Sequence, residues 1–170
     1  MASPGKACGG CDLCCRLYDI EELAKPAHAM CVHARPEGGC GIHGVHPKTC
    51  QTFECMWLAS DELNGLWRPS TAGFVLRTEG PALYVDVDPE RRGAWRREPY
   101  YAQIKAWSEL IREGRGMVTV EDHGIHVIFP ERDIYMGRLP PGALIEAGYL
   151  RTSSGPRPWA RLARDKTAAA

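Results

Sequence analysis

Eight cysteines are the residues in this chain whose type and spacing most clearly indicate chemistry. All of them lie between positions 8 and 55, and residues 56–170 contain none. Cysteines used as small apolar fillers would be spread along the chain, because a free thiol fits almost any core position. Thiolates are good ligands for zinc and for iron–sulfur clusters. The clustering therefore predicts metal ligation by Cys8, Cys11, Cys14, Cys15, Cys31, Cys40, Cys50 and Cys55.

The densest part of the cluster is the octet CGGCDLCC at residues 8–15. Two residues between cysteines reverse the backbone so that both thiolates converge on one metal, and glycines ease that reversal. The side chains of neighbouring residues diverge, so Cys15 is expected to serve a second centre or a bridge, or to remain a reactive free thiol. Eight thiolates divide into two Cys₄ sites, a ligand set that suits zinc and iron–sulfur clusters alike.

Histidines present a second type of ligand inside the same window. Neutral imidazole binds zinc, so each of them is an alternative to a thiolate. Each is also a common surface residue, and we expect most of them not to be ligands, with His43 the best placed because it follows Cys40 by three residues. The four histidines of the window are His28, His33, His43 and His46, while His123 and His126 are expected in a hairpin.

The cysteine-rich segment resembles the YkgJ-type cysteine-cluster family, known as the C-x-x-C-x-x-C-C zinc- or iron-chelating domain. The resemblance covers residues 8–57: the opening octet, then Cys31, CGIH at 40–43, and the closing residues Pro47, Cys50, Phe53, Cys55 and Trp57. The family's usual Arg-Pro is His46-Pro47 here, so the role of that arginine does not carry over. The resemblance implies metal binding in the cytoplasm, with zinc or iron as the metal.

A related cysteine cluster occurs in bacterial flagellin lysine methylases, where an iron–sulfur centre is implied. This chain matches only the cluster, so methylation is not transferred to it. Residues 58–170 contain no P-loop, dinucleotide fingerprint, H-E-x-x-H or G-x-S-x-G motif, and no catalytic signature is found outside the cysteines. Whether the protein is an enzyme is left open by the sequence.

The elements that must position the cysteines lie in residues 1–60, which have little apolar periodicity. Short helices are expected at residues 19–25, with Asp19 as N-cap, and at 47–58, where Cys50, Phe53 and Trp57 share one face. Bound metal supplies folding energy where a hydrophobic core cannot. We therefore expect a loop-rich region stapled by metal, with Phe53 and Trp57 as the apolar cover of the site.

Residues 61–150 show a different pattern, with β-favouring stretches that alternate apolar and polar residues. The pattern predicts an α+β fold in which a small antiparallel sheet of two hairpins packs against one helix. Asp86 and Asp88 fall on one face of a predicted strand and are expected to be solvated. Strands are expected at residues 73–78, 82–88, 117–121 and 125–130, and the helix at 100–113 before Gly114.

Residues 151–170 carry four arginines and one lysine against one aspartate, together with two prolines. This composition predicts a basic, flexible tail. The alternative is a basic segment that docks on an acidic protein partner.

The overall charge is balanced, because 21 Lys+Arg offset 21 Asp+Glu, so no strong field attracts nucleic acid or anionic membranes. Acidic residues outnumber basic ones within residues 8–57, which disfavours a zinc ribbon that binds nucleic acid. No apolar run reaches the roughly 18 residues of a membrane span, and the first residues lack the apolar core of a secretory signal. We therefore expect a cytoplasmic protein without nucleic-acid or membrane partners.

Two functions remain open at this point. The first is an accessory metal-binding protein whose eight cysteines form two sites, with the sheet or the basic tail contacting a protein partner. The second is an iron–sulfur enzyme or electron-transfer component with the cluster at its active site. The cofactor expected in either case is zinc or iron, an iron–sulfur cluster being one form of the latter.

Overall fold

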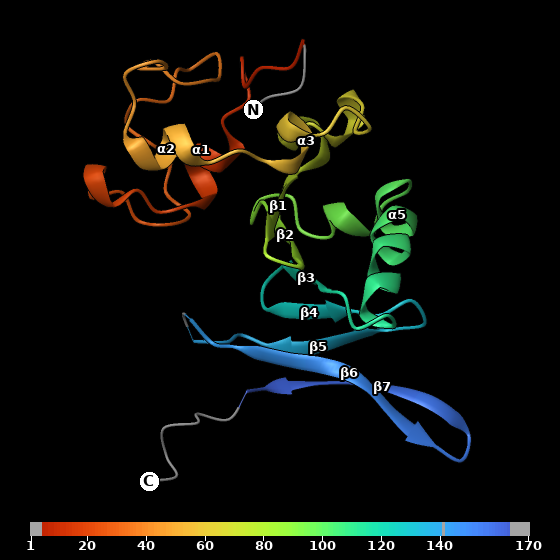
Figure 1. Cartoon of the computed structure of the whole chain (residues 1–170). Helices are drawn as coiled ribbons and strands as arrows, with labels where there is room; N and C mark the ends of the chain where they lie inside the picture. Colours follow the sequence, from red (N-terminus) through yellow and green to blue (C-terminus); the bar gives the residue numbers. More distant parts are fainter. Residues whose placement is uncertain (1–4, 141, 164–170) are drawn as a thin grey trace, which may run out of the picture.

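A computed structural model describes residues 5–140 and 142–163 (Figure 1). The chain contains both helices and strands, in agreement with the α+β class. The cysteine-rich region lies at one end of the molecule, the main sheet lies in the middle, and a C-terminal hairpin lies at the other end. Within the described residues, no helix is long and apolar enough to cross a membrane.

The main sheet has five strands in the order β1-β2-β3-β4-β5. Both predicted hairpins are confirmed, since β1 pairs antiparallel with β2 and β3 with β4. The strands are β1 (Phe74–Glu79), β2 (Ala82–Val87), β3 (Met117–Glu121), β4 (Ile125–Ile128) and β5 (Asp133–Gly137). The expectation of a purely antiparallel sheet is wrong at one pair, because β2 and β3 run parallel.

The parallel pair follows from the connection between the two hairpins. A parallel pair needs a crossover of a dozen or more residues, usually with a helix. The crossover here contains η3 (Ala94–Arg96), α5 (Tyr100–Trp107) and η4 (Ser108–Ile111). The helix predicted at 100–113 is thus present, with its last turn tightened to 3₁₀ geometry.

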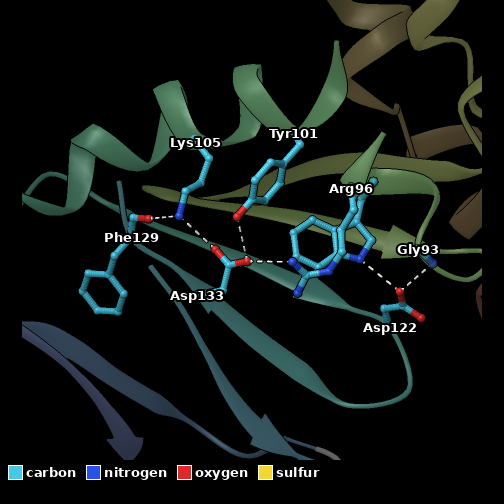
Figure 2. A network of polar contacts seen from close by, with 8 residues as sticks. Gly93, Arg96, Tyr101, Lys105, Asp122, Phe129 and Asp133 are labelled. Atoms are coloured by element: carbon cyan, nitrogen blue, oxygen red, sulfur yellow. Dashed lines mark hydrogen bonds and ion pairs between the residues drawn. The ribbon is translucent and has the colours of Figure 1, made fainter. Parts of the chain in front are cut away.

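The helical crossover covers one face of the sheet and forms the main core with it. Trp95, Phe74 and Ile104 are fully buried there. Polar contacts hold α5 to β5 at the margin of this core: Asp133 accepts hydrogen bonds from Arg96 at 3.0 Å, Tyr101 at 3.1 Å and Lys105 at 2.9 Å (Figure 2). The carboxylate therefore joins the crossover to the edge of the sheet.

The opposite face of the sheet is covered in two separate places. Near β1, Leu13 and Leu17 of the cysteine-rich region pack on Val75. Near β4 and β5, a second sheet of two strands packs through Tyr149 and its neighbours onto Phe129. This second sheet pairs β6 (Ile145–Thr152) with β7 (Gly155–Leu162).

The β6–β7 hairpin corrects the prediction of a flexible tail from residue 151. Ile145, Ala147 and Ala160 alternate along the two strands and face the buried Val127 and Phe129, so the segment gains apolar burial that a solvated tail lacks. The last residues of the predicted tail, 164–170, lie outside the described residues.

The cysteine-rich region consists of short helices joined by loops, as expected. The helix predicted at 19–25 is only a 3₁₀ turn. The backbone of Ala24 adopts the left-handed conformation, which ends the turn, and Lys25 then forms a β-bridge with Ile20. Its elements are α1 (Leu13–Leu17), η1 (Glu21–Leu23), α2 (Lys48–Thr52) and α3 (Met56–Ala59), followed by η2 (Gly65–Trp67) and α4 (Pro69–Ala72).

Candidate metal centre

All eight cysteines line one cavity of about 280 Å³ in the cysteine-rich region. Each of them is a free thiol, with Cys11 and Cys31 buried and the other six partly exposed. Phe53 and Trp57 also line the cavity, together with Val75 of the sheet. The structure thus gathers every sequence-predicted ligand around one space and places the predicted apolar cover beside it.

The C-x-x-C turn forms as the spacing predicts. The backbone N–H of Cys11 donates to the carbonyl of Cys8 at 2.8 Å, which closes the reversal between the two thiols. The loop that leads to Cys40 packs directly on this turn: a Cβ at Gly38 would lie 2.4 Å from the Gly10 carbonyl oxygen. Only glycine permits this approach, which brings Cys40 to the same cavity as Cys8 and Cys11.

A break in the predicted helix at 47–58 allows Cys50 and Cys55 to share the cavity. Positions five residues apart on a continuous helix point about 140° away from each other. In the structure α2 ends at Thr52, Phe53 is extended, and α3 begins at Met56. The expectation of one helical face with Cys50, Phe53 and Trp57 is therefore wrong, although all three line the cavity.

The cysteines surround the cavity without converging on a point. Within residues 5–140 and 142–163, no three His, Cys, Asp or Glu side chains are grouped closely enough to hold a metal ion. A tetrahedral zinc site requires four donors about 2.0–2.3 Å from one centre.

Electrostatics in the cavity shift the pKa values of five of the thiols, four upward and one downward. Burial raises the pKa of the Cys8, Cys50 and Cys55 thiols. A hydrogen bond between neighbouring thiols raises the pKa of Cys14 and lowers that of Cys15 to about 7. Metal binding therefore displaces protons from the four thiols whose pKa is raised, whereas the Cys15 thiol ionises more readily than an ordinary cysteine.

Lys25 is a buried cation beside the helix that carries Cys14 and Cys15. Its side chain is 8% exposed, and its Nζ donates to the carbonyls of Pro26 at 2.8 Å, Arg16 at 3.4 Å and Tyr18. Arg16 and Tyr18 lie at the C-terminal end of α1, where carbonyls have no partner within the helix. The Lys25 side chain thus supplies hydrogen-bond donors to the free carbonyls at the end of α1 and places a positive charge near Cys15.

Replacing Lys25 by methionine is expected to destabilise the cysteine-rich region. The variant keeps the length of the side chain but leaves three carbonyls without their charged donor, at a cost of about 2 kcal/mol. The rate of proteolysis within residues 8–57 measures the effect, and Lys48→Met at an exposed position of α2 is the matched control. Equal proteolysis rates in the two variants would contradict this role for Lys25.

Three of the four histidines in the cysteine window line the cavity, namely His33, His43 and His46. The rings of His43 and His46 lie 5.0 Å apart between centroids. The Nδ1 atom of His46 is buried without a hydrogen-bond partner among the described residues. His28 does not line this cavity and lies instead at a second one.

The cysteine-rich region is attached to the sheet by two carboxylates that the sequence predicts to be solvated. Asp86 and Asp88 are 7% and 5% exposed. Asp86 Oδ2 accepts from Tyr18 Oη at 2.6 Å and from Arg77 Nε at 2.7 Å, while Asp88 pairs with Arg16 at 3.5 Å. Strand alternation alone does not reveal these partners, because Tyr18 and Arg16 come from the end of α1, distant in sequence, and Arg77 comes from the paired strand β1.

A larger cavity of about 940 Å³ adjoins the first. It lies over the open part of the sheet, between the cysteine-rich region and the segment that precedes β6. Tyr18, Asp19 and Arg77 line both cavities. The Tyr18–Asp86–Arg77 contacts therefore lie where the thiol-lined cavity meets the larger one.

Comparisons with known proteins add no assignment to this geometry. No protein-family model matches the chain. No curated protein and no solved structure matches it either.

Proposed function

We propose that this protein binds iron through its cysteines and holds it as a sulfur-bridged, polynuclear centre. The observation that carries the proposal is the single cavity lined by all eight thiols. Iron–sulfur clusters are held by cysteine thiolates, commonly four for each cluster, and eight residues supply two such sets. The proposal agrees with the zinc- or iron-chelating family that the cysteine spacing resembles.

A polynuclear centre agrees with the presence of all eight thiols on one cavity of about 280 Å³, because the bridging sulfides of a cluster occupy space between the ligating thiolates. The apolar residues Phe53, Trp57 and Val75 on the cavity wall also limit access of water to the site.

Two zinc sites remain the alternative metal assignment, because two Cys₄ sets use all eight cysteines without a remainder. Among roles for an iron–sulfur centre, an accessory or electron-transfer protein requires only the cavity of the cysteines. An iron–sulfur enzyme is favoured by one further observation, the adjoining 940 Å³ cavity that shares Tyr18 and Arg77 with the thiol-lined space.

Anaerobically purified full-length protein is expected to be brown, to absorb visible light and to contain iron together with acid-labile sulfide. Elemental analysis and the absorption spectrum measure these properties directly. Colourless protein that contains two zinc ions per chain would establish the alternative. Protein that takes up neither metal would refute metal binding altogether.

Single Cys→Ser variants test whether all eight cysteines belong to the centre. Each substitution is expected to lower the metal content, because serine oxygen is a poor ligand for soft metal sites. Lys48→Ser is the control, since Lys48 is an exposed residue of α2 that does not line the cavity. Normal metal content in three or four of the cysteine variants would leave a single Cys₄ centre.

A further inference from the structure

We infer that Arg68 positions the metal centre from outside the cysteine-rich motif: it holds the Cys8 backbone and donates a second hydrogen bond to a metal-bound thiolate. The inference rests on the proposed function, since it assigns a partner to the thiolates of that centre. Arg68 lies eleven residues after Trp57, the last residue of the family resemblance, and immediately before α4.

The guanidinium of Arg68 is fixed against the C-x-x-C turn. Its Nη2 donates to the carbonyl oxygen of Cys8 at 2.8 Å. The same nitrogen lies 3.3 Å from where a Cβ at Gly9 would stand, so the group packs directly on the turn. The guanidinium carbon lies 5.8 Å from the centre of the Trp57 ring, and Trp57 lines the thiol cavity.

The Nε atom of Arg68 is buried and has no hydrogen-bond partner among the described residues. A buried N–H without an acceptor costs about 1–3 kcal/mol, so native proteins rarely keep one without a reason. Metal-bound thiolates are hydrogen-bond acceptors, and Cys8 is the cysteine against which this guanidinium lies. A thiolate of the loaded centre therefore supplies the acceptor that Nε lacks.

The charge of Arg68 provides a second reason. Thiolates bring negative charge into a cavity whose wall includes Phe53, Trp57 and Val75, and burying such charge is costly unless it is paired. A guanidinium stays charged at every relevant pH and presents donors in a rigid fork, so one nitrogen can hold the backbone while another faces sulfur. Lys25 supplies a further cation beside α1.

Arg91 is a matched control for the structural part of this role. Its Nη1 donates to the Ser70 carbonyl and its Nη2 to the Thr71 carbonyl, each at 2.7 Å. It thus anchors backbone as Arg68 does, but it binds the backbone of α4 and makes no hydrogen bond to the Cys8–Cys11 turn. An effect common to Arg68→Met and Arg91→Met is structural, whereas an effect confined to Arg68→Met belongs to the metal centre.

The experiment loads full-length wild-type, Arg68→Met, Arg68→Lys and Arg91→Met protein anaerobically with iron and sulfide, and separately with Co²⁺. The measurements are the sulfur-to-metal charge-transfer band, the midpoint potential of the iron form and the rate of metal release to a chelator. Circular dichroism identifies any variant that fails to fold, and Arg68→Lys keeps the charge while removing the fork.

Arg68→Met is expected to release metal at least about tenfold faster than wild type, the usual scale for losing a partner of a ligand. Its charge-transfer band is expected at lower energy and its potential is expected to fall, because the hydrogen bond stabilises the sulfur electrons and the reduced cluster. Arg68→Lys should lie between, and Arg91→Met should match wild type. Wild-type properties in Arg68→Met, or equal shifts in Arg91→Met, overturn the inference, whereas wild-type protein that takes up no metal refutes the proposed function itself.

Discussion

Removal of metal from the full-length protein is expected to open residues 8–57 to protease while the five-stranded sheet stays protected. The loops before α3 contact the sheet through one small apolar cluster, in which Leu13 and Leu17 pack on Val75 with Tyr18 and Phe53 beside them, and only Trp57 and its neighbours reach the main core. Structural zinc sites in small peptides contribute apparent binding energies of about 10–16 kcal/mol, far more than this cluster provides. Loss of such an energy leaves the loops without their principal stabilisation.

The measurement compares limited proteolysis of loaded protein with that of protein treated with chelator and reductant under anaerobic conditions. Amide hydrogen exchange supplies the control, because protection of Val85 and Val118 in the central strands should be the same in both states. Unchanged proteolytic resistance of residues 8–57 after complete metal removal would contradict the metal-stapled description of this region.

Local sequence signals predicted the two hairpins and the helix after Pro99 correctly. Apolar and polar residues alternate in β1 to β4, turn residues separate the paired strands, and Tyr100 and Ile104 repeat at helical spacing. The positions of the cysteines, all between residues 8 and 55, likewise predicted that they lie in one region. These properties depend on residues close together in the chain, which is why sequence periodicity reveals them.

Features that depend on tertiary contacts were missed. Asp86 is buried because Tyr18 and Arg77 bind it from different elements, and no periodicity in β2 announces those partners. The composition of residues 151–170, with its arginines and prolines, predicts a tail, whereas β7 within it pairs with β6 and packs Ala160 beside Phe129. Arg68 lies outside the motif and contacts Cys8 sixty residues earlier in the chain.

For the candidate site, the sequence predicts which residues are ligands but not how they are arranged. Cysteine identity and clustering predict the ligand set, since softness of the donor is a property of the residue type. The approach of Gly38 to Gly10 and the break between α2 and α3 decide which thiols face one another, and both depend on the folded chain. The grouping of eight ligands therefore required the structure.

The second large effect is expected in the core between the crossover and the sheet, at a position that does not line the thiol cavity. Trp95 is fully buried between the crossover and the sheet, and its Nε1 donates to Asp122 Oδ2 at 3.0 Å. The centroid of its ring also lies 5.4 Å from the centroid of the His126 ring. The guanidinium carbon of Arg96 lies 4.0 Å from the centroid of the Trp95 ring.

Trp95→Ala is expected to lower the free energy of unfolding by about 4 kcal/mol, the usual cost of removing a large aromatic side chain from a core. Trp95→Phe is the matched control: it keeps much of the ring and loses the indole donor, at a cost of about 1 kcal/mol for the hydrogen bond. Asp122 retains its bond from the Gly93 N–H at 2.9 Å in both variants.

Urea denaturation followed by far-ultraviolet circular dichroism measures both changes. Metal content of the folded variants should equal that of wild type, because Trp95 does not line the cysteine cavity. A loss of less than about 1 kcal/mol in Trp95→Ala would mean that the crossover does not depend on this side chain for its packing on the sheet.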